Sequence, residues 1–148
     1  MQDFLLKVEG TIHTLSTPWV MGILNITPDS FYKKSRISTP SEAAEQAEHM
    51  LKQGAKIIDI GGYSSRPGAA KVSQEEEWNR LHKIIPAVRS ITDKIPGTFI
   101  SVDTFRANVA EKAIDVGAHM VNDISGGNLD NRMHKVVAEL NCPYILMH

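Results

Sequence analysis

The sequence predicts an α/β fold in which parallel strands alternate with helices. Short apolar runs that suit buried strands recur five times between Val20 and Met147. Segments with apolar residues at helical spacing separate successive runs. Four of the five runs end in polar or glycine-rich residues. The carboxyl ends of parallel strands are where α/β proteins place their chemistry, so the pattern predicts one shared cleft at this edge of the sheet.

The composition fits one domain of ordinary size. The chain has 148 residues, of which 42% are hydrophobic and 22% are charged. The net charge of -1 gives no overall field that would attract nucleic acid or an anionic membrane. A single cysteine, Cys142, excludes an internal disulfide and fits a reducing compartment. Since no apolar run approaches the ~20 residues of a membrane helix and no secretory signal begins the chain, we expect a cytoplasmic protein.

The first elements are a hairpin and a strand. Residues 4–15 alternate loosely between apolar and polar around Glu9-Gly10, which predicts that Leu5–Val8 pairs with Thr11–Thr14. In a barrel, such a hairpin covers the open bottom. The strand Val20–Leu24 then ends at Asn25, and a long loop follows.

Two helix starts are marked by capping motifs. Thr39, with Pro40 and Glu42 after it, predicts a helix that ends near Gly54. The strand 56–60 and a glycine-containing loop come next, and Ser73 with Glu76 predicts the second helix start. This second helix runs through Val88 and contains Pro86, which should kink or divide it.

The remaining elements follow the same order. The sequence predicts strands and helices in the following order: strand 99–102 ending in Asp103, helix 105–116, strand 119–121 ending in Asn122, a helix from about Leu129 to Leu140, and strand 144–147. Two architectures fit this order, a doubly wound open sheet and part of a (β/α)₈ barrel. A complete barrel needs ~250 residues, so this chain is too short to close one. The loop at Gly61-Gly62 lacks the third glycine of a dinucleotide fingerprint, which weakens the open-sheet cofactor interpretation.

Asp103 and Asn122 have complementary hydrogen-bonding chemistry. A carboxylate only accepts hydrogen bonds, whereas a carboxamide donates and accepts, so the pair suits the edge of a flat heterocycle. An alternative or additional role for Asp103 is to cap the helix that begins near Phe105. Asp59 lies inside an apolar run, where we expect a supporting structural role rather than direct chemistry.

Cations gather in the two loops that precede the first two helices. Arg66 can bind a phosphate or carboxylate through two parallel hydrogen bonds, and Ser64 and Ser65 add hydroxyl groups beside it. The other loop cations are Lys33, Lys34 and Arg36. Together these residues predict a cationic mouth and a phosphorylated or carboxylated substrate.

Long motifs in this order resemble those of the dihydropteroate synthase family. Residues 21–31 resemble the first signature of that family, and residues 54–67 resemble its second. The segments 101–104, 121–124 and 146–148 are similar to its next three strand ends. The similarity covers essentially the whole chain.

The resemblance implies a (β/α)₈ TIM barrel of the pterin-binding type. Residues 1–148 would form the N-terminal part of a single domain, namely the hairpin and the first five strands with four helices. The implied reaction condenses a dihydropterin-methyl diphosphate with p-aminobenzoate by dissociative substitution, giving dihydropteroate and diphosphate in folate synthesis. No protein nucleophile is needed.

The resemblance also implies roles for individual residues. Asp103 and Asn122 would bind the pterin, Ile124 and Met147 would line its pocket, and Asn25 would hold Mg²⁺ and the diphosphate. An ionised Asp103 would stabilise positive charge on the pterin methylene group. Catalysis would rest on Asp103, Asn25 and Arg66. The p-aminobenzoate site, where sulfonamides also bind, would be formed by Phe31, Ser65, Arg66 and Pro67.

The chain departs from the family at three points. Tyr63 and Ser65 stand where Glu and Thr are common, and Lys33 stands where the first signature usually has a second Asp. We hypothesise that Lys33 pairs directly with the diphosphate. The family's later strands, which supply further pterin and diphosphate ligands and much of the homodimer interface, have no counterpart here. We therefore expect a fragment without synthase activity of its own.

Two other functions remain open at this stage. A methyltransferase barrel that moves a methyl group from methyltetrahydrofolate to a corrinoid protein would share the pterin carboxylate and amide. It would not need the Arg66 loop or the loop at residues 27–31, and these loops favour the synthase. The second alternative is a non-catalytic binding fragment, which would bind pterin diphosphate without turnover.

Overall fold

A hairpin precedes a parallel five-stranded sheet in the computed structural model, which describes residues 3–26, 39–63 and 71–147. The antiparallel hairpin consists of β1 (Phe4–Val8) and β2 (Thr11–Leu15). The sheet has the order β3-β4-β5-β6-β7 and contains β3 (Val20–Asn25), β4 (Ala55–Gly61), β5 (Phe99–Asp103), β6 (Met120–Asp123) and β7 (Tyr144–Leu146). The described helices are α1 (Pro40–Lys52), α2 (Gln74–Leu81), α3 (Ile84–Thr92), α4 (Ala107–Asp115) and α5 (Met133–Leu140).

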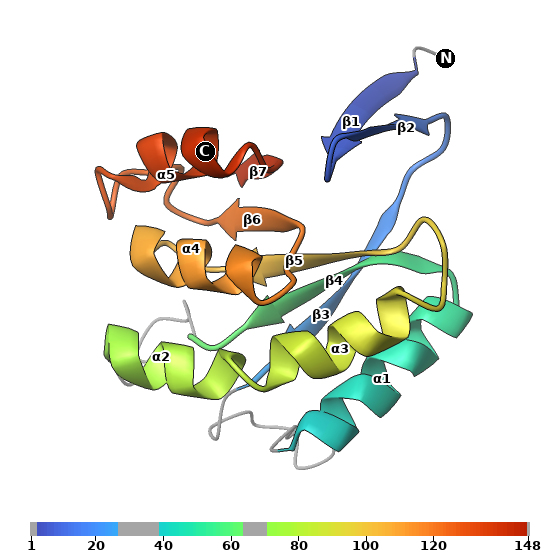
Figure 1. Ribbon diagram of the computed structural model, residues 1–148, viewed down its shortest axis with the longest axis horizontal. Coiled ribbons are helices and arrows are strands. Elements are labelled where there is room, and N and C mark those ends of the chain that lie inside the picture. Colours follow the sequence, from blue (N-terminus) through green and yellow to red (C-terminus); the bar gives the residue numbers. More distant parts are fainter. Residues whose placement is uncertain (1–2, 27–38, 64–70, 148) are drawn as a thin grey trace.

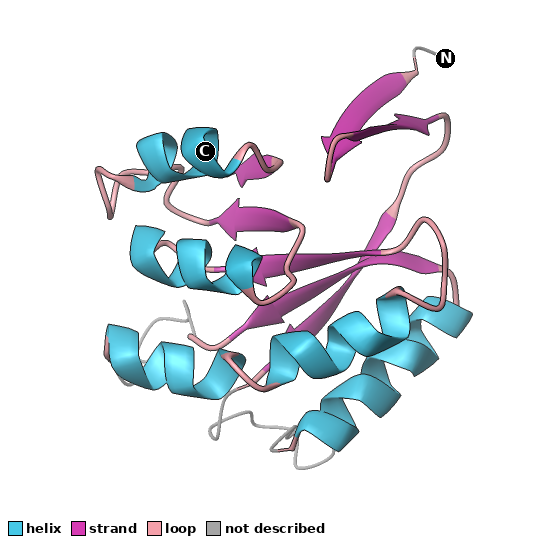
Figure 2. Ribbon diagram, in the orientation of Figure 1, coloured by secondary structure: helices cyan, strands magenta, loops and turns pink. Residues whose placement is uncertain are grey.

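The helices lie on one side of the sheet, and the hairpin lies away from them (Figures 1 and 2). Because successive side chains on a strand point to opposite faces, each strand contributes alternate residues to the helix side. Leu24, Ile58 and Ile100 belong to this set and are almost fully buried among the helices. The sequential order of the strands, with a helical crossover between neighbours, is the arrangement expected of one part of a (β/α)₈ barrel.

The opposite face of the sheet carries a second apolar cluster near the amino ends of the strands. We call it the floor cluster; its buried members are Val8, Ile57, Phe99 and Met120. Val8 comes from the hairpin, whose register pairs Leu5 with Thr14 and Val8 with Thr11 as predicted. The hairpin therefore closes the amino-terminal end of the sheet's inner face, the role expected for it.

The capping motifs act largely as the sequence predicts. The Thr39 side chain accepts a hydrogen bond from the Glu42 backbone at 3.2 Å, and the Glu42 carboxylate accepts one from the Thr39 backbone N–H at 3.1 Å. The Ser73 side chain accepts from the Glu76 backbone, but the Glu76 carboxylate is bound by Arg80 instead of completing a box.

The predicted second helix is divided into α2 and α3. The break falls at residues 82–83, one turn before Pro86. Proline has no N–H to donate to the carbonyl of residue 82, and within the first turn of α3 this missing donor costs nothing. The predicted helix is thus two helices, and Pro86 lies in the first turn of the second.

Several element boundaries differ from the prediction. Helix α4 begins at Ala107 rather than Phe105, and Asp103 does not cap it: the Ala107 N–H donates to Asp130 Oδ2 at 3.0 Å. Helix α5 begins at Met133, and Leu129 is 65% exposed instead of forming part of the apolar stripe. Strand β6 continues to Asp123, so Asn122 lies within the strand.

Candidate functional site

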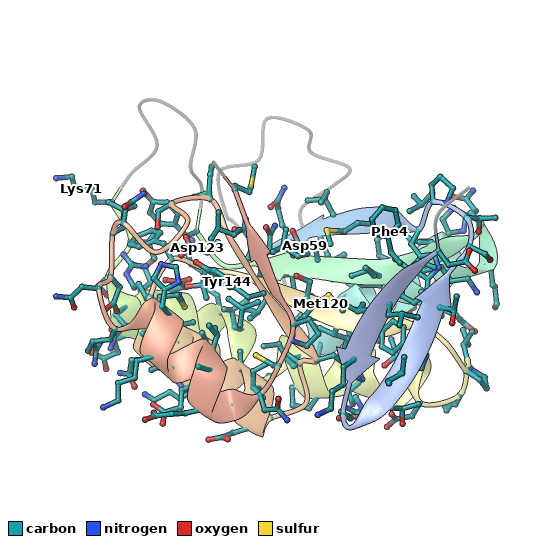
Figure 3. All side chains as sticks on the ribbon, turned by 90° about the horizontal axis from the view of Figure 1, so that it is seen from above. Phe4, Asp59, Lys71, Met120, Asp123 and Tyr144 are labelled. Atoms are coloured by element: carbon teal, nitrogen blue, oxygen red, sulfur yellow. The ribbon has the colours of Figure 1, made fainter. Side chains whose placement is uncertain are left out.

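Polar side chains occupy the inner face of the sheet above the floor cluster. We call them the strand-end group: Asn25, Asp59, Ser101, Asp103 and Asn122. The register pairs Asp59 with Ser101 and Asp103 with Asn122 on neighbouring strands. Figure 3 shows Asp59 on the side of the sheet away from the helices. The inner face therefore changes from apolar to polar along the strands, toward their carboxyl ends.

Gly61 leaves the space in which two of these side chains lie. It stands between Asn25 on β3 and Asp103 on β5 in the register of the sheet. A Cβ atom at this position would lie 3.3 Å from Asp103 Oδ2 and 3.5 Å from Asn25 Oδ1. The absence of a side chain at Gly61 lets the carboxylate and the amide approach each other over β4.

A polar cluster next to Asp103 contains Asp59, Ser101 and Asn122. Asn122 Nδ2 donates a hydrogen bond to Asp59 Oδ2 at 3.1 Å. Three buried oxygen atoms here have no hydrogen-bond partner within the described part of the chain: Asp59 Oδ1, Ser101 Oγ and Asn122 Oδ1. Leaving a buried polar atom unpaired costs ~1–3 kcal/mol, so these oxygen atoms are candidate hydrogen-bonding partners for a ligand.

The two carboxyl groups of the strand-end group are hard to ionise. Burial raises the pKa of Asp103 to about 7, and the negative charges of Asp59, Glu77 and Asp123 act in the same direction. Burial also raises the pKa of Asp59, against the lowering effect of the neighbouring Ser101 and Asn122 side chains. A ligand that brings N–H donors or positive charge would favour the ionised form of Asp103 and lower its pKa.

Asp123 organises the loop that follows β6. Its carboxylate, which is fully buried, accepts hydrogen bonds from the Ser125 and Gly127 backbones at 2.8 and 2.9 Å. The Tyr144 hydroxyl donates to the same carboxylate at 2.8 Å, and burial together with this bond raises the pKa of Tyr144. Asp123 thus points to the helix side and shapes the loop, whereas its neighbour Asn122 faces the site.

The structure brings together some of the predicted site residues. Asp103 and Asn122 are register partners on neighbouring strands, and Asn25 lies in the same row, with Gly61 between it and Asp103. Ile124 and Met147, at the ends of β6 and β7, are 43% and 46% exposed. The predicted residues Phe31, Lys33, Ser65, Arg66 and Pro67 lie outside the described residues.

Sequence reasoning missed three residues around the site. Ser101 shares a face with Asp103 by the period-2 rule for strands, and this rule could have identified it. Glu77 lies one helical turn before the buried Leu81, so its place on the apolar stripe of α2 was a readable signal. Arg106, which pairs with Glu77, has no comparable signal in the sequence.

No group of three or more His, Cys, Asp or Glu side chains that could hold a metal ion occurs in the described ranges. Within residues 3–26, 39–63 and 71–147, no helix is long and apolar enough to cross a membrane. Asn25 supplies one amide oxygen at the rim of the site. A hard oxygen donor of this kind suits a Mg²⁺ ion that completes its coordination with ligand oxygens and water.

Comparison with known proteins agrees with this geometry. A profile of the family described as pterin binding enzyme matches residues 21–148. The dihydropteroate synthase of Bacillus subtilis is 48% identical over 129 residues, which are 87% of this chain and 44% of that protein. The chain belongs to the pterin-binding enzyme family.

Solved structures show the same fold. The dihydropteroate synthase of Xanthomonas albilineans with 4-aminobenzoic acid superimposes with a TM-score of 0.85 at 37% identity, over 99% of this chain and 52% of that one. The Yersinia pestis enzyme in a sulfonamide drug complex gives a TM-score of 0.84 at 37% identity, over 98% of this chain and 50% of that one. The chain spans about half the length of the relatives it matches, and in this pterin-binding family the strand-end group is the candidate ligand site.

Proposed function

We propose that the complete protein to which this chain belongs is a dihydropteroate synthase. It would join 6-hydroxymethyl-7,8-dihydropterin diphosphate to p-aminobenzoate, giving 7,8-dihydropteroate and diphosphate in folate biosynthesis. The observation that carries the proposal is the set of buried oxygen atoms beside Asp103 that have no hydrogen-bond partner among the described residues. The sequence similarity to dihydropteroate synthases supports the same reaction.

The strand-end group is suited to the pterin ring. Because Asn122 donates its amide N–H to Asp59, its carbonyl oxygen is left to accept. Asp103, Asp59 Oδ1 and Asn122 Oδ1 then form a group of acceptors that matches the N–H donors along a dihydropterin edge. We propose that Ile124 and Met147 line the same pocket from the loop ends.

Asp103 would act electrostatically in the reaction. The C–O bond between the pterin methylene and the diphosphate breaks, and positive charge is delocalised into the ring. An ionised Asp103 stabilises that charge more than it stabilises the neutral substrate, which lowers the barrier. The amine of p-aminobenzoate then forms the new C–N bond and releases a proton, while diphosphate leaves with the bonding electrons.

We propose that Asn25 holds Mg²⁺ together with the diphosphate. The amide oxygen fits a hard cation, and Gly61 leaves room beside it for ligand oxygens. When bound, Mg²⁺ neutralises charge on the leaving diphosphate. Lys33 is proposed to add a direct ion pair to the diphosphate, and equal Mg²⁺ dependence of the wild type and a Lys33→Asp variant would argue against that pairing.

We propose that p-aminobenzoate binds beside the pterin, against Phe31, Ser65, Arg66 and Pro67. The motif similarity supports this placement, with Arg66 as the partner of the benzoate carboxylate. Sulfonamides, which resemble p-aminobenzoate in shape and charge, would compete for this site. A homodimer and a cytoplasmic location remain predictions for the complete protein.

The test is an assay of the complete protein with both substrates and Mg²⁺, following dihydropteroate and diphosphate. We expect equal amounts of the two products and competitive inhibition by a sulfonamide. The isolated 148-residue chain should give no turnover, because the other wall of the site would be missing. Absence of turnover in the complete protein, with pterin diphosphate binding detected by calorimetry, would replace the synthase with a binding function.

A further inference from the structure

The loop that begins at Ile124 is wound around the buried side chain of Asp123. Asp123 Oδ1 accepts hydrogen bonds from the backbone N–H and from the hydroxyl of Ser125, both at 2.8 Å. Its Oδ2 accepts from the Gly127 N–H at 2.9 Å, and its backbone carbonyl accepts from the Gly126 N–H at 3.1 Å. Because the residues on both sides of Ile124 are held in this way, the placement of Asp123 sets the placement of Ile124.

The same loop packs closely against the end of β7. Gly126 has a φ of +57°, and a Cβ atom there would lie 2.6 Å from the Met147 carbonyl oxygen. The Met147 N–H in turn donates to the Asp123 carbonyl at 3.3 Å. Ile124 and Met147, whose side chains are about half exposed, are therefore held in a fixed relation to each other.

Tyr144 connects β7 to the centre of this loop. Its register partner is Val121, two residues before Asp123, so the side chains of Tyr144 and Asp123 share the helix side of the sheet. The Tyr144 hydroxyl donates to Asp123 Oδ2 at 2.8 Å. Among the described residues, it is the donor to this carboxylate that comes from outside β6 and its loop. The Tyr144 ring is held by the edge of the His134 ring on α5, with centroids 5.7 Å apart.

We propose that the Tyr144–Asp123 hydrogen bond positions Ile124 and Met147 as an apolar wall beside Asn122, against which a flat ring binds. The inference rests on the proposed function for the identity of that ring, the dihydropterin. Tyr144 and Asp123 lie on the helix side of the sheet, whereas the strand-end group lies on the inner face. Both are therefore positioning residues, which act on the ligand through the loop and touch neither substrate.

The test is Tyr144→Phe in the complete protein. Phenylalanine keeps the ring beside His134 and removes only the hydroxyl that reaches Asp123. We expect the KM for the pterin diphosphate to rise about fivefold, because the wall is less well placed for the ring. The KM for p-aminobenzoate, measured at saturating pterin diphosphate, should stay within about twofold, because the wall does not contact that substrate.

Thr98→Val is the matched control. Thr98 is buried, and its hydroxyl donates to the Ile95 carbonyl at 2.7 Å in the loop before β5. The substitution thus removes one buried hydroxyl from a loop at the amino-terminal end of the sheet. It should lower the midpoint of urea denaturation as Tyr144→Phe does, and it should change neither KM. A rise in the KM for the pterin diphosphate in both variants would reduce the Tyr144 effect to a general loss of stability and overturn the inference.

Hydrogen exchange separates the failure of this inference from the failure of the proposed function. Tyr144→Phe should speed amide exchange in the peptide 124–129 and leave the hairpin unchanged, whether or not the wild type is a synthase. If the wild type neither turns over nor binds the pterin diphosphate in calorimetry, the proposed function fails, and the exchange result still decides whether Tyr144 holds the loop that carries Ile124. Unchanged exchange in 124–129, or equal changes in the two KM values, would overturn the inference.

Discussion

The two ends of the sheet's inner face are built in opposite ways. At the amino-terminal end, the floor cluster packs apolar side chains against the hairpin, and Trp19 stacks on Phe99 with ring centroids 5.5 Å apart. At the carboxyl-terminal end, the strand-end group buries oxygen atoms that have no partner among the described residues. Both sets come from alternate residues of the same strands, with Phe99 and Asp103 only four residues apart on β5.

This difference separates the part of the inner face that holds the fold together from the part reserved for a ligand. Burying an aromatic side chain stabilises a protein by a few kcal/mol, whereas an unpaired buried oxygen destabilises it by ~1–3 kcal/mol. A face selected for stability alone would continue the apolar pattern to the ends of the strands. Retaining carboxyl groups there is understandable if a bound molecule supplies the missing donors.

Phe99→Ala should have the largest effect on stability. Phe99 is 5% exposed and its ring contacts Trp19, His13 and His119. Removal of a buried phenylalanine ring leaves a cavity and lowers the free energy of unfolding by ~3–5 kcal/mol. Urea denaturation measures this loss. Phe4→Ala is the control, since Phe4 is 68% exposed on the hairpin and should cost less than about 1 kcal/mol. Equal losses in the two variants would contradict the stabilising role of the floor cluster.

Asp103→Asn should have the opposite effect on stability at high pH. The pKa of Asp103 is raised to about 7 in the folded chain, so the folded state binds more protons than the unfolded state between about pH 4 and 7. The stability of the wild type should therefore fall as the pH rises through this window. The loss is at most ~4 kcal/mol, at ~1.4 kcal/mol per pKa unit.

The asparagine variant should lack this part of the pH dependence. It should match the wild type near pH 4, exceed it in stability at pH 8, and bind pterin diphosphate roughly a hundredfold more weakly because a charged acceptor is lost. Thermal unfolding across pH and calorimetry measure the two effects. Asp115→Asn, an exposed change on α4, controls for the altered net charge. A variant that is less stable than the wild type at pH 8 would show that Asp103 supports the fold.

The sequence predicts local features of this molecule better than distant contacts. The Thr39 capping box and the hairpin register depend on residues close in the chain, and both form as predicted. The adjacency of Asp103 and Asn122 was also predictable, since parallel strand ends meet at one edge. The Asp130 cap on α4 was not, because that carboxylate acts across 23 residues and replaces the expected cap at Asp103.

The polar contacts around the site show the same limit. Asp59 was expected to have a supporting role, and its contact with Asn122 fits that expectation. The Glu77–Arg106 pair joins α2 to the residue before α4, and the two residues are 29 positions apart in the chain. The sequence around either residue does not predict its partner. Ion pairs of this kind depend on how the helices pack together. Hydrophobic periodicity indicates which face of a helix is buried, but not which residues of another element that face contacts.

Glu9→Gln should have the smallest effect and tests what holds the hairpin to the floor cluster. Glu9, at the hairpin tip, pairs with Arg89 of α3 at 2.9 Å, and this hydrogen bond lowers the pKa of Glu9. Because the carboxylate is largely exposed, the solvent-screened pair should contribute only ~0.5 kcal/mol at pH 7. Because the pKa of Glu9 is lowered in the folded state, the contribution of the pair is fully present at pH values above the ordinary pKa of glutamate. It is lost as the pH falls through the pKa of the folded state, so the stabilities of wild type and variant should converge in acid.

Glu48→Gln, which removes an exposed pair within α1, is the control for urea denaturation at both pH values. A loss above about 2 kcal/mol in Glu9→Gln would mean that charge, rather than the burial of Val8, holds the hairpin on the sheet.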